Sequence, residues 1–214
     1  MNSNFYELKK ILESNNFDIN TLIHSTTGDG RLESAESEAL IPKYLKTLYK
    51  DIKVIEAPKE RYWYDILIEY KNEKYPINIK MTGNSKSADN VSSKVGMFYA
   101  LTGIWPEEVK GLNTWASFNE KLTENFDPKN DSDYYFLVCF KETGEFLFTS
   151  LKQIETLVPN GNNLPFQCNW NSNIIPTKRS NEEQSYYIIN TFIESFIRKT
   201  YGLDILINWR NVND

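Results

Sequence analysis

The stretch RYWYDILIEYKNEKYPINIKMT (residues 61–82) contains two runs in which apolar and polar residues alternate. In the second run Ile77 and Ile79 alternate with Asn78 and Lys80, so a strand there turns the two pairs to opposite faces. The first run alternates in the same way, and KNEK between the runs supplies a short polar turn. The stretch therefore predicts a β-hairpin with a carboxylate on one strand and an amide and an amine on the next.

The overall composition is that of a globular protein. Of 214 residues, 40% are hydrophobic and 14% aromatic, and the net charge is −5. A chain of this size forms one large domain or two small ones, and we expect a single domain over residues 1–214. The negative charge gives no general attraction to nucleic acid, so any such binding must come from local groups of Lys and Arg.

Cysteine and histidine usage excludes several chemistries. Cys139 and Cys168 have no further Cys or His at metal-ligand spacing, so we expect free thiols. His24 is the single histidine, which excludes a zinc site built from several imidazoles. No apolar segment approaches the roughly 20 residues that span a bilayer, and the N-terminus does not resemble a signal peptide. We therefore expect a cytoplasmic protein without membrane association.

The rest of the chain alternates helical and strand patterns. Apolar periodicity and capping residues predict helices at 4–14, about 32–49 with a kink at Pro42, 91–101, 115–122, and from Ser180 as N-cap to Gly202. Two aromatic and β-branched runs predict strands at 133–140 and 144–151, and 164–175 is loop-like. This order predicts an α/β fold in which a mixed central β-sheet is flanked by helices.

The hairpin also brings reactive side chains together. Asp65 would lie across the tight turn from Asn78 and Lys80. A carboxylate, a second oxygen donor and a lysine at one strand end suit metal-assisted phosphodiester hydrolysis, because oxygens hold Mg²⁺ and the amine stabilises charge. The same Asp and Lys could instead form a simple cross-strand ion pair. A carboxylate-pair hydrolase built on Asp65 and Glu69 is disfavoured, since about 13 Å along one strand exceeds either glycosidase geometry.

These residues resemble the core of the PD-(D/E)xK nuclease superfamily, in which an Asp on one strand is followed across a turn by acid-x-Lys on the next. Two further segments resemble the smaller orthodox type II restriction endonucleases of that superfamily. RLESAESEALIPKYL (31–45) is similar to an acidic helix that often supplies a metal-facing Glu, and PTKRSNEEQSYYIINTFIESF (176–196) is similar to an Arg-(Ser/Thr)-x-Glu-Glu entry into a final helix.

The sequence departs from the family pattern at the second acidic position. Asn78 stands there, and a neutral amide binds Mg²⁺ more weakly than a carboxylate does. Glu69 or one of the helix acids Glu33, Glu36 and Glu38 could supply the missing charge, and we rank Glu38 above Glu36. The resemblance implies that Asp65, Asn78 and the Ile79 carbonyl bind Mg²⁺, with Lys80 and Glu38 completing the catalytic set.

The resemblance further implies a restriction-endonuclease-like fold and a Mg²⁺-dependent, site-specific endonuclease that cuts double-stranded DNA as a homodimer. The DNA contacts are expected from polar and basic residues that flank the hairpin and the last helix: Asn84, Lys86, Ser87, Asn90, Lys94, Lys178 and Arg179. The alternative is a DNA-binding protein on the same scaffold that lost turnover when the second acid became Asn.

Overall fold

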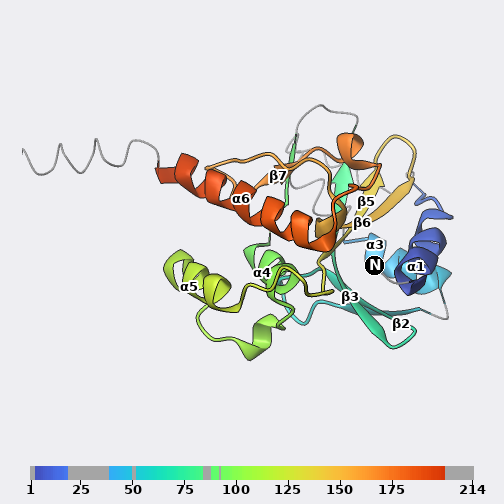
Figure 1. The fold of residues 1–214 in the computed structure, drawn as a ribbon. Coiled ribbons are helices and arrows are strands. Elements are labelled where there is room, and N and C mark those ends of the chain that lie inside the picture. Colours follow the sequence, from blue (N-terminus) through green and yellow to red (C-terminus); the bar gives the residue numbers. More distant parts are fainter. Residues whose placement is uncertain (1–2, 19–38, 50–51, 84–87, 92, 201–214) are drawn as a thin grey trace, which may run out of the picture.

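The computed structural model describes residues 3–18, 39–49, 52–83, 88–91 and 93–200. It is a mixed α/β structure around a five-stranded sheet (Figure 1). The sheet strands are β1 (Lys53–Glu56), β2 (Ile66–Tyr70), β3 (Glu73–Thr82), β5 (Tyr135–Phe140) and β6 (Phe146–Ser150), in that spatial order. The predicted mixed central sheet flanked by helices is thereby confirmed.

Five helices and two further strands complete the described chain. The helices are α1 (Ser3–Glu13), α3 (Ile41–Leu48), α4 (Lys94–Thr102), α5 (Trp115–Asn125) and α6 (Asn181–Thr200). A separate two-stranded sheet pairs β4 (Asp89–Asn90) with β7 (Gln167–Cys168). Short 3₁₀ turns lie at Pro106–Glu108, Leu151–Gln153 and Trp170–Asn173.

The predicted hairpin is formed by β2 and β3, which pair in antiparallel register with Ile66 opposite Ile77. The turn residues Lys71 and Asn72 both have positive φ, of 48° and 64°. Two consecutive left-handed residues are typical of a type I′ turn, whose twist matches that of the flanking strands. Local sequence therefore fixes the register, and with it the faces on which Asp65 and Lys80 lie.

The sheet is antiparallel except at its centre, where β3 and β5 run parallel. Parallel strands need a crossover connection, and the connection here contains α4 and α5. The contact between the hairpin and the start of β5 is therefore made by residues far apart in sequence.

The two sheet faces are buried under different helices. Ile77, Ile79 and Met81 join a core with the apolar residues of α1 and α3, whereas Phe136 and Val138 join a core with those of α4 and α6. Figure 1 shows these two pairs of helices on opposite sides of the sheet. Because side chains alternate along a strand, Asn78 and Lys80 belong to the face that carries α4.

The last helix begins as its sequence predicts. The Ser180 hydroxyl accepts a hydrogen bond from the Glu183 backbone N–H (3.3 Å), and the Glu183 carboxylate accepts one from the Ser180 N–H (2.8 Å). This reciprocal pair is a capping box, which satisfies two backbone donors that the helix itself leaves free. The predicted N-cap is confirmed.

Three details differ from the sequence prediction. The described part of the second helix starts only at Ile41, and Pro42 lies in its first turn, where proline is tolerated, so the predicted kink at Pro42 is wrong. The strand β1 was not predicted, because four residues between two loops give little periodicity. Gln167–Cys168 forms a short strand inside the predicted loop 164–175, which otherwise contains a 3₁₀ turn.

Both cysteines are buried free thiols, as predicted. None of the described helices is long and apolar enough to cross a bilayer.

Candidate active site

Asp65 lies at the point where β2 begins, and its backbone is held from both sides. Its N–H donates to the Ile77 carbonyl (2.9 Å), and its carbonyl accepts from the Ala57 N–H (3.0 Å). One carboxylate oxygen then accepts a hydrogen bond from the Ile79 N–H at 2.7 Å. The carboxylate thus accepts a β3 hydrogen bond that the backbone of β2 would accept if this strand began earlier.

This arrangement leaves the Ile79 carbonyl next to the carboxylate. In an antiparallel strand the N–H and C=O of one residue point toward the same neighbouring strand. Because the Ile79 N–H meets Asp65, the Ile79 carbonyl also faces the side on which β2 has ended. Two oxygen donors, one charged and one neutral, therefore lie at this edge of the sheet.

Lys80 lies on the same side of the sheet as Asp65, as the hairpin alternation predicts. Its ammonium is close enough to lower the pKa of the Asp65 carboxyl, yet the two charges form no ion pair within 4.0 Å. Within the described ranges, the Lys80 ammonium donates no hydrogen bond to another residue either. The simple cross-strand ion pair that competed with the catalytic interpretation is therefore absent.

Asp65 is solvent-exposed as a residue, but protein atoms surround its carboxylate group. Burial raises its pKa, and the Ile79 N–H and the Lys80 charge oppose this rise in part. A carboxylate whose charge is incompletely compensated by the protein favours a bound cation, since a nearby positive charge restores its ionised form.

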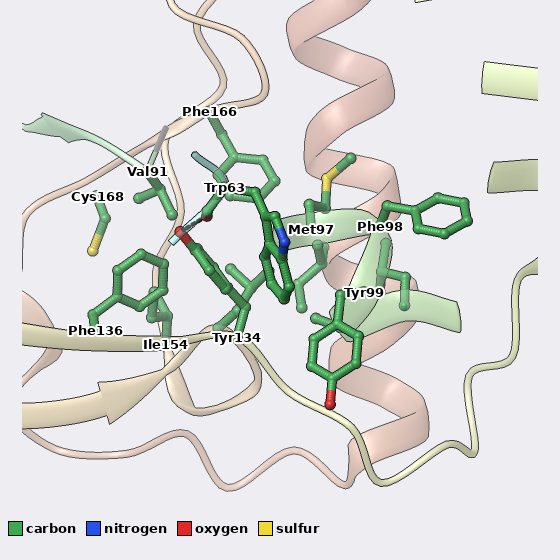
Figure 2. Close-up of a cluster of buried hydrophobic side chains, with 14 of the residues drawn as sticks. Trp63, Val91, Met97, Phe98, Tyr99, Tyr134, Phe136, Ile154, Phe166 and Cys168 are labelled. Carbon is green, nitrogen blue, oxygen red and sulfur yellow. Dashed lines mark hydrogen bonds between the residues drawn. The ribbon is translucent and has the colours of Figure 1, made fainter. Parts of the chain in front are cut away.

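Tyr134, directly before β5, lies in the core beneath the site. Its hydroxyl donates to the Trp63 carbonyl (2.6 Å) and interacts with the polar side chains of Ser93 and Asn78. Burial, followed by the Asp65 charge, raises the pKa of Tyr134 well above its usual value. Figure 2 shows the ring between Trp63 and Phe136 in the core under α4. A buried tyrosine thus fixes both the segment before Asp65 and the amide at Asn78.

The space for the Tyr134 ring is created by a glycine. A Cβ at Gly96 in α4 would lie 2.6 Å from two ring atoms of Tyr134, far inside van der Waals contact. The contact that the Tyr134 hydroxyl makes with the segment before Asp65 was not predicted from the sequence. No local signal marks this contact, because it joins residues across the α4 crossover.

The amide oxygen of Asn78 is buried and has no hydrogen-bond partner among the described residues. An orphaned buried acceptor costs folding free energy unless a ligand or water satisfies it. Asn78 follows Ile77, which pairs with Ile66 in the hairpin, so its side chain lies on the sheet face that carries Asp65. The Asn78 amide oxygen is therefore a candidate third oxygen donor, with Asp65 and the Ile79 carbonyl.

A cleft of about 340 Å³ opens over this edge of the sheet. Its walls come from the start of α3, the loop between β1 and β2, and the hairpin. The lining residues are Ala39, Pro42, Glu56, Ala57, Lys59, Glu60, Arg61, Tyr62, Tyr64, Asp65 and Ile79. The loop between β1 and β2 was not predicted to belong to the site.

The donor set fits a hard divalent cation in part. Mg²⁺ takes oxygen ligands and is typically held by one or two carboxylates together with water and substrate phosphate. Asp65, Asn78 and the Ile79 carbonyl are all oxygen donors, but residues 3–18, 39–49, 52–83, 88–91 and 93–200 contain no group of three or more acidic, His or Cys side chains that could hold a metal ion. Asp65 is thus the one carboxylate established beside these donors. Glu33, Glu36 and Glu38 lie outside the described residues, although Ala39, next to Glu38, lines the cleft.

Glu69 is not a second ligand. It lies four residues from Asp65 toward the turn end of the hairpin, where its carboxylate forms an ion pair with Lys53 at 2.7 Å.

The predicted DNA contacts fall in different surroundings. Asn84, Lys86 and Ser87 lie outside the described residues. The Asn90 side-chain carbonyl accepts from Gln167 (2.9 Å), and the Lys94 ammonium donates to the Asn113 carbonyl (2.7 Å) and lies 4.6 Å from the Trp115 ring centroid.

The two predicted DNA contacts before α6 also differ from each other. Lys178 is exposed, whereas Arg179 is partly buried and its guanidinium contacts other residues of the protein. It donates to the Glu155 carbonyl (2.8 Å) and lies 4.1 Å from the Tyr187 ring centroid. The DNA contacts of both residues remain predictions.

No protein-family description matches this chain, and no curated protein matches its sequence. A function can therefore be proposed only from the residues and their geometry.

Proposed function

We propose that this protein is a Mg²⁺-dependent, site-specific endonuclease that hydrolyses phosphodiester bonds of double-stranded DNA. The observation that carries the proposal is the Asp65 carboxylate, which accepts from the Ile79 N–H and lines an open cleft, with Lys80 on the same sheet face and in no ion pair with a described residue. The antiparallel hairpin with Asp at the start of one strand and Asn-x-Lys on the next supports the resemblance to PD-(D/E)xK nucleases and a restriction-endonuclease-like fold.

Three oxygen donors would hold the cation: the Asp65 carboxylate, the Asn78 amide oxygen and the Ile79 carbonyl. A bound Mg²⁺ supplies Lewis-acid stabilisation of the charge that develops on the phosphate oxygens. Water attacks phosphorus, the bond from phosphorus to the leaving sugar oxygen breaks, and that oxygen takes up a proton.

Lys80 has the chemistry to assist this attack. Its half-buried ammonium is directed by β3 to the face that carries Asp65, and no carboxylate within 4.0 Å neutralises it in the described chain. It can orient the attacking water and stabilise negative charge in the transition state, where a preorganised cation is more effective than solvent. Tyr134 acts as a positioning residue, because it fixes Asn78 and the Trp63 carbonyl without facing the cleft.

The test is cleavage of a long duplex of known sequence by purified protein with Mg²⁺. We expect discrete fragments that disappear with EDTA. Lys80→Ala should lower the rate about 10²- to 10³-fold, the range for loss of one preorganised electrostatic group, while circular dichroism stays that of the wild type. Cleavage by Lys80→Ala at the wild-type rate would show that the site is assigned to the wrong residues.

The second candidate is a DNA-binding protein that does not cut. It is favoured by Asn78 at the second acidic position and by the single carboxylate described among the ligands. A gel shift without fragments would support it. In that case Asn78→Asp should restore Mg²⁺-dependent cutting, because it supplies the missing charge.

We also propose that the protein acts as a homodimer, since a palindromic DNA target has two-fold symmetry. Helix α6 offers a suitable surface: Tyr186, Ile193 and Ile197 are 48%, 48% and 60% exposed at spacings that align them on one face. Its first turn is acidic and its last turn basic, so an antiparallel pair of α6 helices brings opposite charges together. Sedimentation should show a dimer that Ile193→Glu/Ile197→Glu converts to folded monomer; an unaltered dimer would exclude this face.

A further inference from the structure

The turn Lys59–Glu60–Arg61 lines the same cleft as Asp65 and Ile79. The residues after it are firmly anchored. Tyr62 and the Trp63 indole N–H (2.8 Å) both donate to the Glu107 carboxylate, and Trp63 packs against Tyr134 with ring centroids 6.0 Å apart (Figure 2). The turn is therefore mounted on the same aromatic core that positions Asp65 and Asn78.

Two positively charged side chains on this turn have no partner among the described residues. Lys59 and Arg61 are exposed, and neither forms an ion pair or hydrogen bond with any residue of the described ranges. The situation differs at Arg179, which pairs with Glu155, and at Arg198, which pairs with Glu194. An arginine left without a partner in a cleft has its full set of donors available for a ligand.

The acidic residues of the cleft do not cancel these charges. Glu56 is already paired with Lys46 at 2.5 Å, which leaves Glu60 as the one unpaired acid on the turn. Asp65, which also lines the cleft, belongs to the proposed cation site. Among the described residues, the cleft therefore adds two positive side chains and one unpaired negative one, Glu60, to the proposed cation site.

Arg61 has φ +55°, a left-handed backbone conformation that is uncommon outside glycine. Such a conformation costs free energy and persists only where the surrounding structure enforces it. Residues of this kind cluster at ligand-binding sites. The left-handed backbone of Arg61 and its charge without a described partner together indicate a role in ligand binding.

We propose that Lys59 and Arg61 bind the DNA backbone at a phosphate that neighbours the scissile one. The assignment rests on the proposed nuclease function. The planar Arg61 fork can meet two phosphate oxygens at once, and Lys59 adds a point charge. The clamp positions the strand so that the scissile phosphate reaches Asp65 and Lys80, and it reads no base sequence.

The experiment compares Lys59→Ala/Arg61→Gly with wild type and with Lys10→Ala/Lys110→Ala, which loses the same charge at exposed positions outside the cleft. Glycine at 61 accommodates the positive φ, so the fold is not strained. Duplex binding is measured by fluorescence anisotropy in EDTA over a range of salt concentrations, and cleavage separately with Mg²⁺. We expect the cleft variant to bind about tenfold more weakly at low salt and its salt slope to fall by about 1 to 2, with no such change in the control.

The outcomes separate this inference from the nuclease proposal. An unchanged affinity and slope for the cleft variant, in a wild type that cuts, would overturn the clamp alone. If the wild type binds DNA without cutting it, the nuclease proposal is overturned. The salt dependence of binding then still tests the phosphate contact of Lys59 and Arg61. Absence of any duplex binding by wild type overturns both.

Discussion

The two ends of the β2–β3 hairpin treat their charged residues in opposite ways. At the turn end, Glu69 pairs with Lys53, and Lys71 pairs with Glu7 from α1. At the other end Asp65 and Lys80 share one face without an ion pair, and the cleft beside them holds Lys59 and Arg61, which also have no described partner.

The difference separates structural charges from candidate functional ones. Exposed pairs at the turn end need no specific environment and contribute little to stability. At the open end the protein crowds a carboxylate enough to raise its pKa and leaves an amide oxygen buried without a partner. Such local costs persist where a ligand offsets them, so the open end is the part of the hairpin to test by mutation.

Of the substitutions at the two ends of the hairpin, Asp65→Asn should have the largest effect on the cleavage rate. Loss of the carboxylate at the cation site is expected to reduce cleavage about 10³-fold or more, since the group that holds the metal charge is removed. Cleavage of duplex DNA under single-turnover conditions measures this, with Lys53→Gln at the turn end as control. Retention of most of the activity would place the metal elsewhere.

The same variant should gain stability in the absence of metal. The folded protein raises the pKa of Asp65 above its value of about 4 in an unfolded chain, so the ionised carboxylate destabilises the fold at neutral pH. Asp65→Asn removes that cost, and we expect a higher melting temperature near pH 7 in EDTA. The advantage should vanish as the pH falls below about 4, where wild type is protonated in both states. A lower melting temperature at neutral pH would contradict the assigned cause.

Gly96→Ala should have an intermediate effect through Tyr134. The new Cβ would overlap the ring at 2.6 Å, and overpacking of a buried site typically costs about 1–3 kcal/mol. The displaced ring also releases Asn78 and the Trp63 carbonyl, so cleavage should fall as well. Gly83→Ala is the matched control for stability, because its Cβ meets only the end of the Glu142 side chain at 3.1 Å. Equal urea midpoints for the two variants would show that the ring has room to move.

Lys53→Gln should have the smallest effect. Its pair with Glu69 is largely exposed, and pairs of this kind contribute no more than about 1 kcal/mol. Cleavage should match wild type, because the turn end takes no part in the chemistry. A large loss of activity here would remove the distinction between the two ends.

The hairpin could be predicted because its information is local. Alternation of period two assigned Ile77, Asn78 and Lys80 to their faces, and the polar turn fixed the register. The capping box at Ser180 and Glu183 was readable for the same reason. The acid–Lys arrangement is thus a direct product of sequence pattern.

The remainder of the site could not be predicted because it depends on distant contacts. Tyr134 reaches Asn78 only after the chain has crossed through α4 and α5, and Gly96 matters only because that ring lies against it. The DNA contacts were predicted from nearness in sequence to the hairpin and the last helix. They include Arg179, which pairs with Glu155, and do not include Arg61, which lines the cleft.

The parallel pairing of β3 with β5 has a consequence for synthesis on the ribosome. The hairpin with Asp65 and Lys80 emerges early, but Tyr134 and the neighbouring strand β5 follow only after the long crossover. A half-made chain therefore carries reactive groups without the frame that aligns them. If the finished protein cuts DNA, the order of the strands delays that hazard until translation has passed Tyr134.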